Sequence, residues 1–474
     1  MTAGGDMDPE AFRREAHRVA DWLADYFATP ERFPVLSRAR PGEIRSSLPA
    51  SAPEEGESFS MIFADFERII LPGITHWNHP GFFAYFATSG SAPGVLAEFL
   101  SAGLNVQAML WRTSPAATEL EEVTLGWLRT LVGLPDGFEG VIYDTASVSS
   151  LHALAAAREY AVAGVRADGL TARDLPPLRL YCSEHAHSSI DKAVILLGLG
   201  HTSLRRVEAD AEFRMRPDAL AAAIAEDMRT GCRPVAVVAT VGTTSTTSVD
   251  PVGAISAICR RDDIWLHVDA AYAGAAALVP EYRWILRDAA AADSVVINPH
   301  KWLFTPFDLS ALFCRRMDML RQAFALTPEY LKTPEDAEVR NLMDTGIQLG
   351  RRFRALKLWM VLRHFGASGL RARLAEHMRL ARLFAGWVDA STGFELCAPV
   401  PFSVVCFRAR ESDGFNATLL DRLNDSGEVF LSHTRVEGRF TLRLAVGHIR
   451  TTEAHVTLAW TLLQRFAAEL TSPT

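Results

Sequence analysis

The feature that most constrains the fold is an alternation of short apolar runs with helical segments, which begins near residue 90. Each run is rich in Val, Ile and aromatic residues and lacks the polar alternation of a strand with one face in water. The segments between the runs are rich in Ala, Leu and Arg. Continuous apolar strands separated by helices predict an α/β fold, with a mainly parallel central sheet and helices on both faces. The runs are VIYD (141–144), LRLYC (178–182), VAVVATVG (235–242), IWLHVDAA (264–271) and SVVINP (294–299).

The residues before this alternation predict a helical segment that needs a partner. Asp8 and Pro9 have the residue types of a helix N-cap and a first helical position. Apolar residues then recur at helical spacing, so one face of this helix must pack against another surface. Residues 37–57 are rich in Pro, Ser and charge and predict a wrapping linker. The apolar positions are Phe12, Ala16, Val19, Leu23 and Tyr26.

The chain after residue 350 predicts a smaller second region. A long amphipathic stretch, LGRRFRALKLWMVLRHFG, ends at Gly366, and strands are expected near SVVCF and FTLRLAV. We therefore expect an N-terminal helical segment over 1–90, a large domain over 91–365 and a small C-terminal α+β domain over 366–474.

Composition narrows the functional classes. Lys+Arg 48 against Asp+Glu 56 give a net charge of -8, which argues against a nucleic-acid or membrane-surface protein. The longest strongly apolar stretch, 270–279, is too short to cross a bilayer, and the N-terminus has no apolar signal-peptide core. The six cysteines contain no CxxC pair, which favours reduced thiols over disulfides or a zinc finger. We expect a cytoplasmic globular enzyme.

Two charged residues end consecutive predicted strands. Lys301 follows SVVINP directly and stands between His300 and Trp302, a poor setting for a solvated amine, although a surface lysine is the simpler alternative. Asp269 ends the preceding strand, where a carboxylate is either a helix cap or the partner of a cation. A buried amine suits a Schiff base with an aldehyde, and a carboxylate suits the protonated ring nitrogen of pyridoxal 5'-phosphate. The pair therefore indicates this cofactor.

A turn of small residues is a candidate phosphate site. The strand VIYD runs into TASVSS (145–150) and then a helix, so backbone N–H groups and hydroxyls would face an anion. By itself such a turn is usually only a helix cap. Thr243 and Thr244 follow another strand end and offer more hydroxyls, and Gly242 permits close backbone approach.

A histidine at a third strand end allows two interpretations. His187 follows LRLYC, where its flat ring could stack on an aromatic cofactor, although a structural histidine is the simpler alternative. A rival interpretation is a metal-dependent hydrolase with the ligands His185, His187, His267 and Asp269. The metal site leaves Lys301 and the Ser/Thr-rich turns unexplained. We therefore favour the cofactor and expect no metal.

Several runs, taken in order, resemble the group II pyridoxal-phosphate-dependent decarboxylases, and most closely the aromatic-L-amino-acid decarboxylases. The resemblance covers most of the chain. It implies a type I aminotransferase-like fold and a homodimer with active sites at the subunit interface, in which the N-terminal segment packs on the partner subunit. The runs are HWNHPGFFAYF (76–86), SPAATELE (114–121), AHSS (186–189), WLHVDAAYAG (265–274), NPHKW (298–302) and LGRRFR (349–354).

The resemblance also implies roles at the matching positions. Lys301 would bind pyridoxal 5'-phosphate covalently, Asp269 would pair with its ring nitrogen, and His187 would stack on its ring. Tyr330, in the polar loop 325–345, would return a proton to the α-carbon of the substrate. The positions around the phosphate and the ring substituents would be Ala146, Ser147, Thr244, Asn298 and His300.

An aromatic-rich set predicts a pocket for an aromatic side chain, unless these residues are simply core. In the family, glycine at the place of Gly350 goes with room for an indole. We therefore favour tryptophan or 5-hydroxytryptophan, decarboxylated to the arylalkylamine and CO2, and leave DOPA, tyrosine and phenylalanine open. The set is Trp77, Phe82, Phe83, Phe86 and Phe307, near Thr88.

A neighbouring activity is the second alternative. Family members that form an aldehyde tend to replace the loop tyrosine by Phe or the stacking histidine by Asn, and this chain has Tyr330 and His187 at those places. Plain decarboxylation is therefore expected over an aromatic aldehyde synthase. Departures from the family pattern leave the substrate range open; they lie at 109–113, 144–145 and 343–348.

Overall fold

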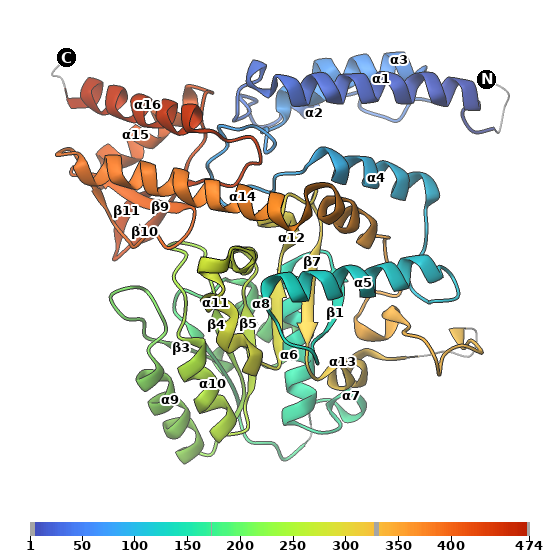
Figure 1. Ribbon diagram of the computed structural model, residues 1–474, viewed down its shortest axis with the longest axis vertical. Helices are drawn as coiled ribbons and strands as arrows, with labels where there is room; N and C mark the ends of the chain where they lie inside the picture. Colours follow the sequence, from blue (N-terminus) through green and yellow to red (C-terminus); the bar gives the residue numbers. More distant parts are fainter. Residues whose placement is uncertain (1–4, 172, 327–330, 472–474) are drawn as a thin grey trace.

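The computed structural model describes residues 5–171, 173–326 and 331–471, and a seven-stranded sheet forms its centre (Figure 1). The strand order is β1-β7-β6-β5-β4-β2-β3. The pairs β3–β2, β2–β4, β4–β5 and β5–β6 are parallel, whereas β7 is antiparallel to both β6 and β1. The predicted mainly parallel sheet is confirmed. The strands are β1 (Glu139–Tyr143), β2 (Leu178–Ser183), β3 (Leu204–Val207), β4 (Arg233–Thr240), β5 (Trp265–Asp269), β6 (Ser294–Ile297) and β7 (Ser310–Cys314).

Helices cover both faces of this sheet, because alternate strand residues point to opposite sides. Ala236 and Val238 of β4 belong to the core that α6, α8 and α13 complete. Val237 and Ala239 belong to the opposite core, which α5, α9 and α10 complete. The helices of this domain are α5 (Pro115–Val132), α6 (Ala146–Ala161), α7 (Val165–Asp168), α8 (Ser189–Leu196), α9 (Pro217–Arg229), α10 (Val252–Arg261), α11 (Trp284–Arg287), α12 (Pro299–Trp302) and α13 (Met317–Phe324).

A second, antiparallel sheet of four strands lies in the C-terminal part, in the order β10-β11-β9-β8 (Figure 1). One of its faces packs on the helices α14, α15 and α16, and the shared core also takes in Phe83 from the N-terminal part. The elements are α14 (Ala355–Ala390), β8 (Phe394–Leu396), β9 (Val404–Ala409), α15 (Asp413–Asp425), β10 (Ser432–Val436), β11 (Arg439–Ala445) and α16 (Glu453–Thr471).

The amphipathic stretch predicted to end at Gly366 continues beyond it. Helical geometry is interrupted at Gly366, whose φ is 61° and ψ is 171°, and then resumes as far as Ala390. Glycine adopts a positive φ without the steric cost that a Cβ would bring. Gly366 is therefore a kink between two helical halves of α14, and the prediction of a helix end there was wrong.

The N-terminal helix forms as predicted. The Asp8 carboxylate accepts from the N–H groups of Glu10 and Ala11 at 3.2 and 3.1 Å, and Pro9 takes the first helical position. In this chain α1 buries none of its residues. In Figure 1 it lies at the top of the molecule beside α3. The elements are α1 (Pro9–Ala28), α2 (Glu43–Ser47), α3 (Phe59–Asp65) and α4 (Ala92–Leu104), and none of the helices described is long and apolar enough to cross a membrane.

Candidate active site

A cavity of about 230 Å³ opens at the carboxyl edge of the parallel strands, where open α/β sheets bind their ligands. Thr240 ends β4, Asp269 ends β5, and Asn298 directly follows β6, so neighbouring strands deliver polar groups to one wall. Most of the predicted site residues meet here. Those that line the cavity are Phe86, Thr88, Ala146, Ser147, His187, Thr244, Asp269, Asn298, His300, Lys301 and Phe307.

Lys301 lies on α12, the short helix after β6, and faces an aromatic ring. Its Nζ is 5.4 Å from the ring centroid of Phe86. Burial lowers the pKa of Lys301; the carboxylate of Asp269 opposes this shift, and the guanidinium of Arg443 adds to it. A lowered pKa increases the fraction of neutral amine, which is the nucleophilic form.

Asp269 is a buried carboxylate, only 7% exposed. Its Oδ1 accepts from the N–H of Ala271 at 3.1 Å, which orients the group at the strand end. Among the residues that the structure describes, no cation lies within ion-pair distance of this carboxylate. A buried carboxylate without an ion pair is costly, so Asp269 suits a ligand that brings a positively charged nitrogen.

His187 lies at the mouth of the cavity and is held in one ring form. Its Nδ1 accepts from the backbone N–H of Ser189 at 3.1 Å, so in the neutral ring the proton lies on Nε2. Partial burial lowers the pKa of His187, Asp269 opposes this shift, and Lys301 adds to it. The ring is therefore neutral near pH 7 and presents a flat apolar face.

The small-residue turn forms the N-terminus of α6. The N–H groups of Val148 and Ser149 donate to the carbonyl of Thr145, whereas the first N–H groups of a helix have no acceptor within it. Ala146 and Ser147 lie at that position and line the cavity. The turn therefore offers backbone donors and the positive end of a helix dipole to an anion.

The departure at Asp144 does not place a carboxylate in the cavity. Its Oδ1 accepts from the backbone N–H of Thr145 at 2.6 Å and from the hydroxyl at 3.2 Å. Thr145 itself lines the cavity, and Asp144 is not among the lining residues. The carboxylate is thus turned onto the backbone of the phosphate turn.

Two buried polar atoms of the cavity-lining residues are available to hydrogen-bond a ligand. The Oδ1 of Asn298 and the Oγ1 of Thr240 are buried and have no hydrogen-bond partner among the described residues. Two aromatic rings also line the cavity, because Phe86 stacks on Tyr272 with ring centroids 3.8 Å apart. The cavity therefore fits a flat ring with polar substituents and an anionic arm.

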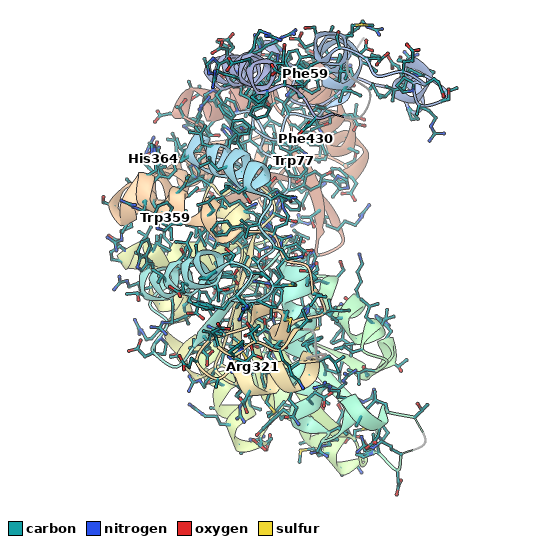
Figure 2. The ribbon with its side chains drawn as sticks, turned by 90° about the vertical axis from the view of Figure 1, so that its right-hand side faces the viewer. Phe59, Trp77, Arg321, Trp359, His364 and Phe430 are labelled. Atoms are coloured by element: carbon teal, nitrogen blue, oxygen red, sulfur yellow. The ribbon has the colours of Figure 1, made fainter. Side chains whose placement is uncertain are left out.

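Not every predicted residue reaches the cavity. Trp77 and Gly350 lie outside its lining. The ring of Trp77 is tilted against that of Phe82, with centroids 4.4 Å apart, and the Phe82 ring lies 5.5 Å from that of Phe430 (Figure 2 labels Trp77 and Phe430). Phe82 and Phe83 are fully buried core residues. Tyr330 lies outside the described residues. One chain thus builds only part of the expected side-chain pocket.

The alternative metal site is not supported. Both ring nitrogens of His267 are taken, Nδ1 by the hydroxyl of Ser294 at 2.9 Å and Nε2 by the hydroxyl of Ser150 at 3.1 Å. No group of three or more His, Cys, Asp or Glu side chains in the described part of the chain is placed to hold a metal ion. His267 ties α6 to the sheet, so the predicted set His185, His187, His267 and Asp269 does not converge.

Sequence reasoning assigned no role to Tyr272, which lines the cavity, or to Arg443, which contacts the lining residue Phe86. Tyr272 lies between Phe86 and Trp302, with its ring centroid 4.8 Å from that of Trp302. Arg443 of β11 is buried with its guanidinium 4.6 Å from the Phe86 ring. The available signal was a charged residue inside the apolar run FTLRLAV, since such a residue at a core position usually serves a partner.

Comparison with known proteins agrees with this geometry. The family model described as the pyridoxal-dependent decarboxylase conserved domain matches residues 41–410. Aromatic-L-amino-acid decarboxylase of Sus scrofa is 41% identical over 98% of this chain and 98% of its own length. Phenylacetaldehyde synthase of Arabidopsis thaliana is 41% identical over 98% of this chain and 97% of its own length. The crystal structure of Oryza sativa TDC with PLP and tryptamine has a TM-score of 0.95 at 35% identity, covering 99% of this chain and 100% of that one.

The chain belongs to the pyridoxal-dependent decarboxylase family. The predicted family, enzyme class and type I fold are therefore confirmed, and pyridoxal 5'-phosphate is the cofactor. The residues present fit it, because the cavity combines a half-buried amine, a buried carboxylate and a helix N-terminus for the phosphate. It also holds two buried polar atoms that have no hydrogen-bond partner within the described ranges.

Proposed function

We propose that this enzyme decarboxylates aromatic L-amino acids to arylalkylamines and CO2, with tryptophan or 5-hydroxytryptophan favoured and DOPA, tyrosine and phenylalanine as further candidates. The observation that carries the proposal is that the half-buried Lys301, just after β6, and the buried Asp269, at the end of β5, line one cavity with the N-terminus of α6. The aromatic wall of Phe86 and Phe307 supports an aromatic rather than an acidic substrate.

Each residue has a separate task in this reaction. Lys301 attaches the cofactor through Nζ, and its lowered pKa keeps the amine reactive. Asp269 is the carboxylate available to hold a proton on the ring nitrogen. Ala146, Ser147 and Thr244 hold the phosphate. When bound, pyridoxal 5'-phosphate supplies an electron sink for the pair that CO2 leaves behind.

Proton return decides between the amine and an aldehyde. We assign this proton to Tyr330 and the stacking contact to His187, whose ring form is fixed by Ser189. The aldehyde synthase is a second candidate because a phenylacetaldehyde synthase is 41% identical to this chain. The presence of both Tyr330 and His187 favours the amine.

A homodimer would complete the substrate pocket. Apolar residues of α1 and α4 line a groove of about 590 Å³, which we call the α1–α4 face. On this face Leu96 is 61% exposed and Phe99 is 53% exposed. An apolar groove of this size typically marks an interface. Trp77, predicted from the aromatic-rich set, and Gly350, predicted from the family resemblance, are exposed and lie outside the cavity of their own chain. A second copy would bring them to it.

The state of the cysteines supports a cytoplasmic location. All six cysteines are described and are free. Burial raises the pKa of Cys182 and of Cys314 to about 12, so these thiols stay protonated and unreactive. A reducing cytoplasm suits such a set.

A substrate panel tests the proposed function. Purified enzyme with added pyridoxal 5'-phosphate is given tryptophan, 5-hydroxytryptophan, DOPA, tyrosine, phenylalanine, histidine and glutamate, and CO2, amine and aldehyde are measured. Equal amounts of CO2 and amine from an aromatic substrate would support the proposal. Release from glutamate alone, or aldehyde as the main product, would contradict it.

A further inference from the structure

The two elements that flank the phosphate turn are attached to the end of the 325–345 loop and the residues just after it. Tyr143 ends β1 just before the turn, and His152 lies on α6 just after it. The Tyr143 hydroxyl donates to the carbonyl of Thr345, and the N–H of Ile347 donates to Nε2 of His152 at 2.9 Å. Both side chains are buried. We call Tyr143 and His152 the aromatic clamp.

The bonds of the clamp require a neutral histidine. Nδ1 of His152 lies 2.6 Å from the carbonyl oxygen of Val148, which can only accept, so the proton lies on Nδ1. Nε2 is then free to accept from Ile347. Burial lowers the pKa of His152, and the hydrogen bond to the Val148 carbonyl and the carboxylate of Asp144 oppose this shift only in part, so the ring stays neutral near pH 7.

The clamp also requires a glycine opposite it. The rings of Tyr143 and His152 stack with centroids 4.4 Å apart and an interplanar angle of 19°. A Cβ on Gly346 would lie 2.9 Å from Nε2 of His152 and 2.9 Å from Cε1 of Tyr143. Only glycine lets the backbone come this close. The departure from the family pattern at 343–348 therefore packs directly on the clamp.

Beyond the clamp the chain becomes an exposed apolar edge. Ile347 is 74% exposed and Leu349 46% exposed, and Gly350 follows them. Gln107 supports the far end, because its Oε1 accepts from the N–H of Arg351 at 2.6 Å. The edge 347–350 is thus held at both ends while its apolar side chains remain open.

We propose that Tyr143 and His152 are positioning residues that hold Leu342–Ile347 on the phosphate turn and so present the edge 347–350 to the substrate bound in the partner subunit's cavity. The proposal rests on the proposed function and its homodimer. It assigns the clamp to substrate binding and not to the chemical step, because neither side chain lines the cavity.

Two matched substitutions at one position separate hydrogen bonding from packing. His152→Leu keeps the volume but removes the acceptor for Ile347, whereas His152→Gln keeps an acceptor at the place of Nε2. Tyr143→Phe removes only the hydroxyl. Tyr181→Phe is its control, since the buried hydroxyl of Tyr181 on β2 donates to Asp227 of α9, away from the clamp. Each holoenzyme is examined by amide hydrogen exchange of 342–352, by retained cofactor absorbance and by kcat and KM.

We expect His152→Leu to raise exchange at Ile347 about tenfold, the scale of one buried hydrogen bond. KM for the aromatic substrate should rise by a similar factor while kcat and cofactor content stay near wild type. Tyr143→Phe should act in the same direction, and His152→Gln should restore both values. Tyr181→Phe should change neither.

Other outcomes would overturn the clamp, its role in substrate binding or the proposed function. Unchanged exchange in His152→Leu, or equal behaviour of the Leu and Gln variants, would overturn the clamp. Raised exchange with an unchanged KM would overturn its role in substrate binding. A wild-type enzyme that retains the cofactor but releases no CO2 from aromatic amino acids would refute the proposed function instead, and the exchange comparison would still decide the clamp.

Discussion

The strand-end cavity and the α1–α4 face differ in the kind of side chain that each offers to a binding partner. In the cavity, the half-buried amine of Lys301 and the buried carboxylate of Asp269 face the space that a ligand would fill. On the α1–α4 face, apolar side chains such as Leu96 and Phe99 are exposed, which suits contact with a protein surface. The contrast teaches that one chain brings the cofactor-binding groups together by itself, whereas in the proposed homodimer the substrate pocket is completed by a second chain.

Removal of the amine gives the sharpest test of the cavity. Lys301→Ala should lower kcat by about 10⁴-fold or more, because the nucleophile that holds the cofactor is lost. Borohydride reduction followed by peptide mass spectrometry should find pyridoxal phosphate on Lys301 in the wild type. Lys192→Ala, at an exposed lysine of α8, is the control and should keep the label and the rate. Cofactor trapped on another lysine would break the assignment.

Neutralising the carboxylate should have the next largest effect. Asp269→Asn should lower kcat by roughly 10²–10³-fold, the scale for loss of one preorganised electrostatic partner. The covalent link to Lys301 should survive and remain trappable by borohydride. Turnover within a factor of about two of wild type, too small a change for such a partner, would show that Asp269 does not tune the cofactor.

A charge placed on the α1–α4 face tests whether this face binds a second subunit. Leu96→Asp should separate the subunits and abolish turnover, since a buried unpaired carboxylate would lie in the interface. Sedimentation velocity and the CO2 assay measure the two losses together. Met228→Asp, at an exposed methionine of α9, is the matched control. A fully active monomer would contradict the proposed division between the two regions.

The loop tyrosine tests product choice, not rate. Tyr330→Phe should keep the cofactor and divert product from amine to aldehyde, because the proton donor is removed. Aldehyde, ammonia and amine are quantified from the same reaction. An unchanged amine yield would remove Tyr330 from the mechanism.

The smallest expected effect is on stability as a function of pH. Burial lowers the pKa of His79, His267 and His377 to about 4, whereas the unfolded chain binds these protons near pH 6.5. The free energy of unfolding should therefore fall as pH drops from about 6.5 toward 4, by about 1.4 kcal/mol per pH unit for each histidine. Asp250, whose pKa burial raises to about 6, opposes this trend.

Urea unfolding at several pH values measures this slope. His377→Gln should make it shallower, because glutamine can accept from the indole N–H of Trp302 as Nδ1 of His377 does at 3.0 Å, yet does not titrate. His364→Gln, at an exposed histidine (labelled in Figure 2), should leave it unchanged. A slope that does not differ between the two variants would contradict the buried, neutral state of His377.

Much of the fold could be predicted because the runs that form it are long and apolar. The strands around Val237, Leu266 and Val296 were found, whereas β3 and β7 were not. β3 has only four residues and carries Arg205 and Arg206. β7 is the strand that runs antiparallel to its neighbours, and only the four-residue helix α12 lies between it and β6, so the regular alternation of strands and long helices does not mark it.

The site residues also fall into those that a local sequence pattern could reveal and those that it could not. Lys301 and Asp269 could be found because a charge at the end of an apolar strand is itself unusual. The clamp of Tyr143 and His152 could not, since its contacts to Thr345 and Ile347 join residues that are about 200 positions apart in the chain. Long-range packing of this kind leaves no local pattern in the sequence.

Complementation between two inactive chains tests the central claim most directly, that a cavity of one subunit is completed by the edge of the other. Lys301→Ala and Gly350→Trp chains are prepared as homodimers, mixed under exchange conditions and assayed for CO2 release. Each homodimer should be inactive, and the hybrid should regain activity, because one of its two cavities combines an intact Lys301 with an intact Gly350 of the partner. Hybrids that form but stay inactive, or a Gly350→Trp homodimer with full activity, would contradict the account.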